Sequence, residues 1–461
     1  MNQPSKRTAL VIAALSSFLT PFMASSINIA LPSIGRDLAM DAVSLSWVAT
    51  TYSLAAAMFL VPFGRLADIV GRKKIYLAGI VVYMVTTFFN GISHSGNALI
   101  IFRALEGIGA AMIFGTGTAI LTSVFPPGER GRALGLNVSA TYLGLSLGPF
   151  LGGLITQYLG WRSIFFCSLP LGALVLILGL WKLHGEWAEA KGERFDLTGS
   201  ILYALSLVLV MYGLSRLPAP LGGALIGAGL IGLVIFVILE SRLTSPVLNV
   251  QLFRQSAVFT LSNLAALINY SATSASGFLL SLYLQNVMGL TPQSAGVVMI
   301  SQPIMQAIFS PLAGKLSDRV EPRFVASAGM GLTVVGLFLL RAIGASTPLI
   351  YVIGCLILLG LGFALFSSPN TNAVMSCVER KCYGVASATL GTMRLIGNML
   401  SLGIASLTFA LIIGRVQITP EVTPLFIQSA RTIYSIFTVL CLLGVLASLA
   451  RGKVRPATAS Q

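Results

Sequence analysis

The segment GRLADIVGRKK at residues 64–74 recurs in shortened form as GKLSD at residues 314–318. Each copy lies between two long apolar runs. A second pair, GIG at residues 107–109 and GLG at residues 360–362, has nearly the same separation, and each member falls in the second apolar run after its loop. This repeat predicts two halves of about six helices each, related by an axis along the membrane normal.

The composition is that of a membrane protein. Of the 461 residues, 56% are hydrophobic and only 9% are charged, whereas soluble domains have about 25% charged residues. Apolar runs recur along the chain, and most are long enough to cross a hydrocarbon core of about 30 Å. We expect fourteen spans, over residues 9–31, 43–63, 75–93, 98–124, 133–157, 163–182, 197–215, 220–240, 257–286, 294–313, 324–342, 347–370, 384–413 and 430–450.

The net charge of +15 does not indicate nucleic-acid binding, because the basic residues follow the membrane topology. With the N-terminus inside, most of the 29 Lys and Arg residues fall in loops on that same side. The positive-inside rule then predicts that both termini are cytoplasmic. Short loops favour a multi-pass protein of the bacterial inner membrane, and nothing indicates a protein partner, so we expect a monomer.

Cysteine and histidine usage argues against a metal site. Five cysteines are scattered in or beside the spans, and the chain has only two histidines. Neither a disulfide framework nor a zinc site follows from that pattern. The spans also lack a nucleophile elbow, an HExxH motif and a Walker loop, so we expect no cofactor and no enzymatic activity.

Two charges fall inside one predicted span. Arg103 and Glu106 are three residues apart and therefore lie on one face of a helix. Glu106 is the only carboxylate placed deep in a span, and such residues are commonly functional. We therefore interpret Glu106 as a proton carrier with Arg103 as its partner, the alternative being a static, self-neutralising ion pair.

Glycines recur at intervals of four in the segment GLNVSATYLGLSLGPFLGG at residues 135–153. Gly144, Gly148 and Gly152 form a smooth ridge that allows another helix to approach closely. Pro149 removes one backbone hydrogen bond and bends the helix there. A single GxxxG is ordinary membrane packing, but the longer pattern is much rarer.

The repeated loop resembles the loop between the second and third helices of the major facilitator superfamily. That resemblance implies a cytoplasmic gate in which Asp68 and Arg72 form a latch, Gly64 and Gly71 allow a tight turn, and Asp318 is a weaker counterpart. The glycine segment resembles the antiporter motif that marks exporters in this superfamily. Its members here are Gly135, Gly144, Gly148, Pro149, Gly152 and Gly153.

Three further segments are similar to the fourteen-helix drug:proton antiporter branch of the superfamily. They are FMASSINIALP at residues 22–32, FDLTG at residues 195–199 and YLQNVMG at residues 283–289. The resemblance implies an all-α membrane fold with six-helix bundles at residues 1–184 and 251–461 and a two-helix insert at 185–250. Met23 stands where the branch usually has an aspartate, and Glu106 stands where it commonly has glutamine.

The implied function is proton-coupled export of small amphipathic molecules by alternating access. One alternative is a transporter of a specific metabolite, lipid or anionic solute with different coupling. Another is a channel, but duplicated halves with glycine ridges fit alternating access better than a fixed pore. Arg394 is the other deep charge, and it is open to a role as an anion site or as a cap for backbone carbonyls. Candidates for the substrate cavity, each equally compatible with a helix-to-helix hydrogen bond, are Asn28, Asn137, Tyr142, Asn263, Asn269, Tyr270, Gln302, Gln306, Asn370, Arg394 and Asn398.

Overall fold

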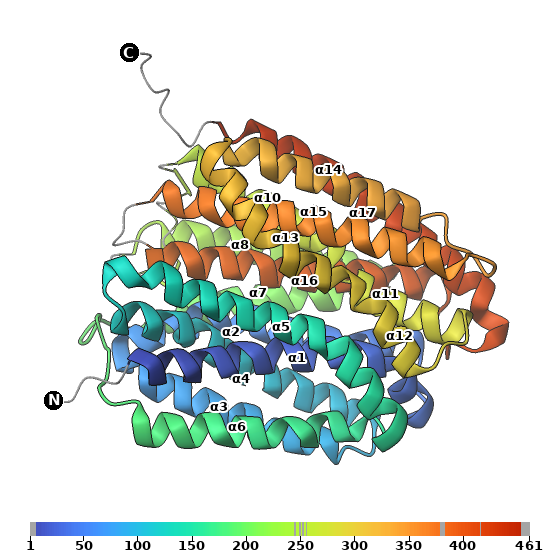
Figure 1. The fold of residues 1–461 in the computed structure, drawn as a ribbon, viewed down its shortest axis with the longest axis horizontal. Helices are drawn as coiled ribbons and strands as arrows, with labels where there is room; N and C mark the ends of the chain where they lie inside the picture. Colours follow the sequence, from blue (N-terminus) through green and yellow to red (C-terminus); the bar gives the residue numbers. More distant parts are fainter. Residues whose placement is uncertain are drawn as a thin grey trace.

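The computed structural model describes residues 6–243, 246–248, 250, 253–254, 256–378, 383–414 and 416–452. Throughout these ranges the regular structure is helical, and the helices run side by side along one direction (Figure 1). Thirteen helices in the described ranges are long and apolar enough to cross a membrane. The chain is therefore a multi-pass membrane protein, as its composition predicts.

The helices fall into three consecutive sets. The first set is α1 (Lys6–Asp37), α2 (Ala42–Val70), α3 (Arg72–Gly91), α4 (Gly96–Val124), α5 (Pro127–Leu159) and α6 (Arg162–Lys182). The insert is α7 (Leu197–Arg216) and α8 (Pro220–Glu240). The second set is α10 (Ala257–Thr273), α11 (Ser276–Leu282), the π-helix η1 (Tyr283–Val287), α12 (Pro292–Met299), α13 (Ser301–Arg319), α14 (Pro322–Leu340), α15 (Leu349–Ser376), α16 (Tyr383–Ile412), the 3₁₀ helix η3 (Pro420–Val422) and α17 (Thr423–Ala450).

The two sets of helices pack with the same pairing pattern. In the first set α1 packs on α5, α2 on α4, and α3 on both α4 and α6. In the second set α10 packs on α16, α13 on α15, and α14 on both α15 and α17. The contacts between the sets are also related in pairs, since α2 packs on α16 and α12 packs on α5. The pseudo-symmetric halves predicted from the repeat are present.

The repeated glycines lie at equivalent contacts in the two halves. A Cβ on Gly109 of α4 would meet the backbone of α3 at Gly79, and a Cβ on Gly362 of α15 would meet the backbone of α14 at Gly329. Gly107 faces the backbone of α2 in the same way as Gly360 faces that of α13. These glycines let neighbouring helices approach at distances that a side chain would prevent.

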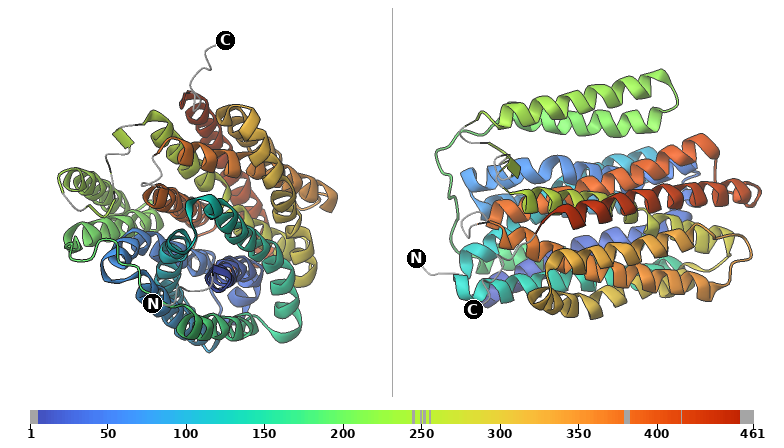
Figure 2. Two further views of the ribbon diagram at one scale, coloured as in Figure 1. Left: turned by 60° about the vertical axis from the view of Figure 1, so that its left-hand side comes forward. Right: turned by 90° about the horizontal axis from the view of Figure 1, so that it is seen from above.

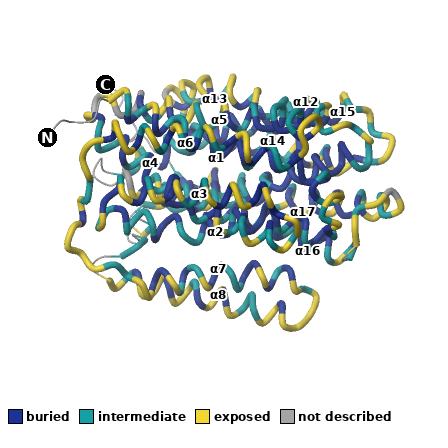
Figure 3. Tube along the Cα trace, turned by 90° about the horizontal axis from the view of Figure 1, so that it is seen from below, coloured by how far each residue is buried: buried dark blue, intermediate teal, exposed yellow. Residues whose placement is uncertain are grey.

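Helices α7 and α8 lie beside the two halves as a separate hairpin (Figure 2). Helix α7 makes the main contacts with the two halves, and it packs on both α2 and α16, one helix from each half. Met211 of α7 packs with Leu54 of α2 and Met399 of α16 in one apolar cluster, while the Tyr203 hydroxyl donates to the Ala57 carbonyl at 3.1 Å. The outer face of α8 is exposed and apolar (Figure 3), as expected for a helix in contact with lipid.

The prediction of one unbroken helix over residues 257–286 is wrong in detail. The segment is divided into α10, α11 and η1, with a break at residues 274–275. Side chains of α16 cause the break, because Asn398 Oδ1 accepts a hydrogen bond from the Ser274 hydroxyl and Ser401 Oγ accepts one from the Ala275 N–H at 2.9 Å. Groups that insert into a helical hydrogen-bond ladder in this way interrupt it.

Candidate transport site and gate

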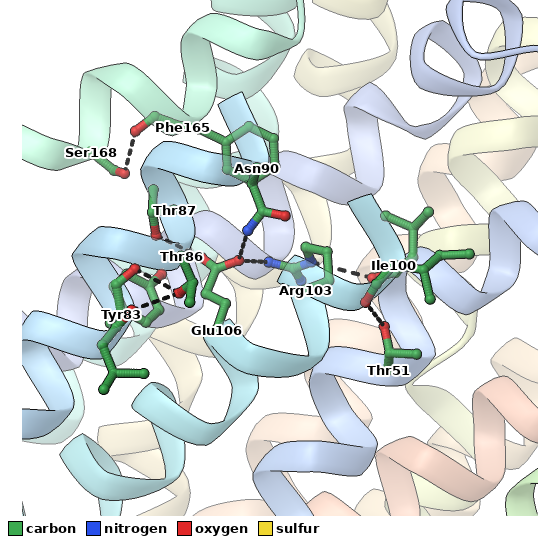
Figure 4. A network of polar contacts seen from close by, with 12 residues as sticks. Thr51, Tyr83, Thr86, Thr87, Asn90, Ile100, Arg103, Glu106, Phe165 and Ser168 are labelled. Carbon is green, nitrogen blue, oxygen red and sulfur yellow. Dashed lines mark hydrogen bonds and ion pairs between the residues drawn. The ribbon is translucent and has the colours of Figure 1, made fainter. Parts of the chain in front are cut away.

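Glu106 lies at the centre of a buried polar network between α3 and α4 (Figure 4). Its side chain is 0% exposed. Oε2 accepts from Arg103 Nη1 and from Asn90 Nδ2, both at 2.7 Å, and Oε1 accepts from Thr87 Oγ1 at 3.1 Å. The Tyr83 hydroxyl faces the same carboxylate but makes no hydrogen bond of good geometry. Three donors, one of them cationic, therefore surround this carboxylate.

Arg103 links this network to α2. Its Nε donates to the Val48 carbonyl at 3.2 Å, and its guanidinium carbon lies 4.3 Å from the centre of the Tyr52 ring. The expected face-sharing of Arg103 and Glu106 is therefore present, with the two charges paired at 2.7 Å. The hydrogen-bonding partners of the pair belong to α2, α3 and α4 of the first half, so the pair lies inside that half and does not reach the second half.

The gate loop is more compact than the sequence indicates. Helix α2 continues through Val70, and α3 begins at Arg72. Gly64 is therefore helical and forms no turn, and a Cβ there would meet nothing within 4 Å. The turn is made by Gly71 alone, whose φ of +129° is costly for other residues. The prediction that Gly64 helps to form the turn is wrong, because the helix extends past it.

Asp68 and Arg72, the residues expected to form the latch, are joined by an ion pair. Arg72 Nε donates to Asp68 Oδ1 at 2.8 Å, while Nη1 donates to Ser123 Oγ of α4 at 2.6 Å and to Glu189 Oε1 at 2.9 Å. The guanidinium of Arg72 thus bonds to the end of α2 and to the end of α4 on this side of the molecule. The side chain of Asp318, the expected counterpart, lies outside the described residues, although its backbone belongs to α13.

The connection from α6 to α7, residues 183–196, lies against the gate loop. We call this segment the acidic linker because three of its glutamates contact the loop: Glu189 and Glu193 pair with Arg72 and Arg65, and Glu186 accepts from the backbone N–H of Lys73. Backbone hydrogen bonds of 2.9 Å join Arg72 N to the carbonyl of residue 187 and the N–H of residue 190 to the carbonyl of Asp68. The insert is therefore attached to the gate through this linker.

The glycine ridge of α5 lies against α1. A Cβ on Gly144 would meet the backbone of Phe18, and one on Gly148 would overlap Ser25 Oγ. Ser26 Oγ donates to the Gly148 carbonyl at 3.0 Å, which closes the contact between the helices. Gly152 packs on Ser26 in the same way. The spacing of these three glycines thus allows the close approach that the sequence indicates.

The other members of the glycine motif are placed differently. Gly153 and Pro149 face α12 of the second half, where Gly153 approaches the Pro292 carbonyl and Pro149 approaches Gly296. Gly135 has no atom within 4 Å of the position of a Cβ. The motif therefore includes contacts within a half, contacts between halves, and one glycine that makes no close contact.

Three of the cavity candidates lie together between the halves. Tyr142 of α5 bonds through its hydroxyl to Ser367 Oγ of α15 at 3.2 Å. Arg394 of α16 lies with its guanidinium carbon 5.7 Å from the centre of the Tyr270 ring, and its Nη2 donates to Thr371 Oγ1 at 2.8 Å. These side chains are only partly buried. Helices α5, α10, α15 and α16 thus bring a cation and two phenols to one place.

The remaining candidates have other surroundings. Asn263 and Asn370 bond to the backbone within the second half, and Asn269 faces Cys441 there. Asn398 bonds to Ser274 at the helix break. The structure gives no hydrogen bond across the halves from the side chains of Asn28, Asn137, Gln302 or Gln306 within the described ranges, although the Asn28 amide lies 3.4 Å from the Cβ position of Gly277.

Sequence reasoning missed two buried charges. Arg451, counted among the cytoplasmic basic residues, is 1% exposed and donates to Asn370 Oδ1 and to the Pro322 carbonyl, both at 2.8 Å. Burial lowers the pKa of Arg451 to about 10. Glu240, at the end of α8, is 2% exposed and faces Asp196. Both residues stand at helix ends, where charge in the sequence indicates exposure.

A polar contact between the two halves was also missed by the sequence reasoning. Gln285 Nε2 of η1 donates to the Ile29 carbonyl of α1 at 2.8 Å. Gln285 lies in the segment YLQNVMG, which the sequence singles out for its resemblance alone. The sequence could not predict this hydrogen bond because the acceptor is a backbone carbonyl of the other half.

Two pseudo-symmetric helical halves in contact through paired helices are the arrangement found in many membrane transporters. The sequence pattern of the Major Facilitator Superfamily matches residues 13–261 and 262–461. The chain belongs to this superfamily and is a transmembrane transporter.

Curated relatives include transporters of different named substrates. The riboflavin transporter RibZ of Clostridioides difficile is 28% identical over 444 residues, covering 96% of each chain. The multidrug resistance protein Stp of Mycobacterium tuberculosis is 32% identical over 411 residues, covering 88% of this chain and 76% of the relative. Among solved structures, a bacterial homologue of the human lysosomal transporter Spinster, inward-facing and unoccupied, has a TM-score of 0.71 at 15% identity over 100% of both chains.

Proposed function

We propose that this protein exports small amphipathic molecules across the bacterial inner membrane by proton-coupled alternating access, with both termini in the cytoplasm and Glu106 as the coupling carboxylate. The observation that supports this proposal most strongly is the burial of Glu106 in a bonded network within a chain of the superfamily. Relatives named for drug resistance and antibiotic export, such as the puromycin resistance protein of Streptomyces alboniger at 30% identity, support the direction of transport.

The coupling step follows from the contacts of Arg103. Protonation of Glu106 would remove the negative partner of Arg103 and weaken its bond to that carboxylate. Arg103 also bonds to the Val48 carbonyl and lies over Tyr52, both on α2. Because α2 is the helix of the first half that packs on α16 of the second, a change at Glu106 would be transmitted to the contact between the halves.

Besides the Tyr142–Ser367 bond, three hydrogen bonds join the two halves near one end of the molecule. Tyr158 bonds to Gln293 at 3.2 Å, Gln285 to Ile29 at 2.8 Å, and Ala42 N to the Val416 carbonyl at 3.0 Å, all toward the end of the molecule away from the chain termini. With cytoplasmic termini, these bonds close the outer side. We therefore propose that the two halves are closed against each other on the outer side.

Transport of one metabolite is the second candidate, and the extent of the match to the riboflavin transporter favours it. That alignment covers 96% of each chain, whereas the alignment to the multidrug resistance protein covers 76% of the relative. A specific transporter would accept riboflavin and reject unrelated amphiphiles, so parallel uptake measurements with riboflavin and rhodamine 6G distinguish the two candidates.

The experiment that tests proton-coupled export uses proteoliposomes with the cytoplasmic face of the protein outward. An acidic lumen should drive accumulation of rhodamine 6G, and each addition of the dye should raise the lumenal pH. Collapse of the pH gradient with nigericin should abolish accumulation. Accumulation that persists without the gradient, or dye entry without proton movement, would contradict the proposal.

A further inference from the structure

Arg394 differs from Arg103 and Arg72 in its hydrogen-bond partners. Arg103 and Arg72 each pair with a carboxylate within hydrogen-bond distance. Among the described residues, Arg394 has no Asp or Glu within ion-pair distance, and its one hydrogen bond goes to the neutral hydroxyl of Thr371 at 2.8 Å. Its Nε is buried without an acceptor. A cation held in a membrane span without a counter-charge is costly, and it commonly marks a functional site.

Aromatic side chains surround this cation. The Tyr270 ring lies under the guanidinium at 5.7 Å, and Phe363 packs edge-on against Tyr270 with ring centres 5.2 Å apart. Tyr142 reaches the same place from the first half, where its hydroxyl bonds to Ser367. These rings offer apolar faces for a planar ligand, and their hydroxyls offer hydrogen bonds at its edge.

We propose that Arg394, with Thr371, Tyr270 and Tyr142, forms a subsite for the acidic group of an amphipathic aromatic anion, which is thus a substrate class of this transporter. The guanidinium N–H groups that Thr371 leaves unpaired match the two oxygens of a carboxylate. This inference rests on the proposed transport function, since it names what that function would move.

The position of the subsite suits alternating access. Arg394, Thr371 and Tyr270 belong to the second half, whereas Tyr142 belongs to α5 of the first half. A ligand that contacts residues of both halves would therefore gain or lose contacts when the halves move relative to each other. An anion would also neutralise Arg394 during the movement, which lowers the electrostatic cost of carrying that cation through an occluded state.

The test is equilibrium binding in lipid nanodiscs with no gradient, measured by fluorescence polarisation. Fluorescein and rhodamine 6G share a xanthene ring system, but fluorescein is an anion and rhodamine 6G a cation. We expect Arg394→Gln to weaken fluorescein binding about tenfold or more and to leave rhodamine 6G binding within about twofold, since a charged hydrogen bond is lost for the anion only. Arg394→Lys should retain part of the fluorescein affinity.

The matched control is Arg341→Gln, which removes an exposed arginine that lies over the Phe338 ring. It should leave binding of both dyes unchanged. Equal loss of both dyes in Arg394→Gln, or no fluorescein binding by the unaltered protein, would overturn the proposal. Because the assay applies no gradient, its outcome is independent of proton coupling, so failure of the proposed function and failure of this subsite are distinguishable.

Discussion

Arg103 and Glu106 form an ion pair of 2.7 Å that is almost fully enclosed by protein. Asn90 and Thr87 complete the hydrogen bonding of the carboxylate from α3. Removing one partner of such a pair leaves an uncompensated buried charge, which costs about 3–5 kcal/mol. Substitution of either partner alone should therefore destabilise the first half.

Two glycines of the same motif differ in their packing, so the effect of the contact with α1 can be measured separately. We expect Gly148→Val to lower the stability of the protein by about 1–3 kcal/mol, because its side chain would overlap Ser25 and press on the Phe22 carbonyl. Gly135→Val belongs to the same motif but has open space at its Cβ, so stability should be unchanged. Thermal unfolding in detergent measures both, and equal losses would show that the α1 contact is not the cause.

The acidic linker should detach when its carboxylates are removed. In the double variant Glu186→Ala, Glu189→Ala, two donors of the gate loop, Lys73 N and Arg72 Nη1, lose their acceptors in the linker. We expect faster tryptic cleavage after Lys191, with a stability change below about 1 kcal/mol, because both glutamates are exposed and Arg72 keeps its bonds to Asp68 and Ser123.

The control for the linker is Glu129→Ala, which breaks the exposed pair with Lys6 in a different part of the same face of the molecule. It should leave the cleavage rate after Lys191 unchanged. A double variant that is cleaved at the rate of the unaltered protein would show that the backbone hydrogen bonds alone hold the linker.

Glu240 is a buried carboxylate that faces a second carboxylate. Asp196 Oδ2 and Glu240 Oε1 both lie beside Gly199, and neither has a hydrogen-bond donor among the described residues. At pH 8, Glu240→Gln should raise stability by about 1 kcal/mol, since the amide can donate to Asp196. Glu240→Ala should lower it, because the Leu248 N–H would lose its acceptor at 2.9 Å. A destabilising Glu240→Gln, measured by thermal unfolding, would contradict this account.

The sequence predicts the architecture well because apolar length, loop charge and the internal repeat all depend on local residues. It could not predict the break in α10–α11, which depends on Asn398 and Ser401 of a distant helix. The extension of α2 through Gly64 was also missed, because the charges of Arg65 and Asp68 lower the local hydropathy to a value typical of a loop.

The candidate site was only partly predictable. Glu106 and Arg103 share a face by helical spacing alone, but Asn90 and Thr87 reach them from α3, and the sequence holds no sign of that contact. Arg394 was identified as a deep charge, yet its association with Tyr142 depends on how the two halves meet. The glutamates of the acidic linker were missed because exposed acidic residues in a loop commonly face solvent.

The measurement that tests the central claim most directly compares Glu106→Gln with the unaltered protein in proteoliposomes, following lumenal pH and rhodamine 6G together. Glutamine keeps the shape of the side chain and an acceptor for Arg103 but cannot exchange a proton. We predict that the variant still equilibrates the dye between the two sides while losing both gradient-driven accumulation and dye-induced proton movement. Full proton-coupled accumulation by Glu106→Gln would contradict the account.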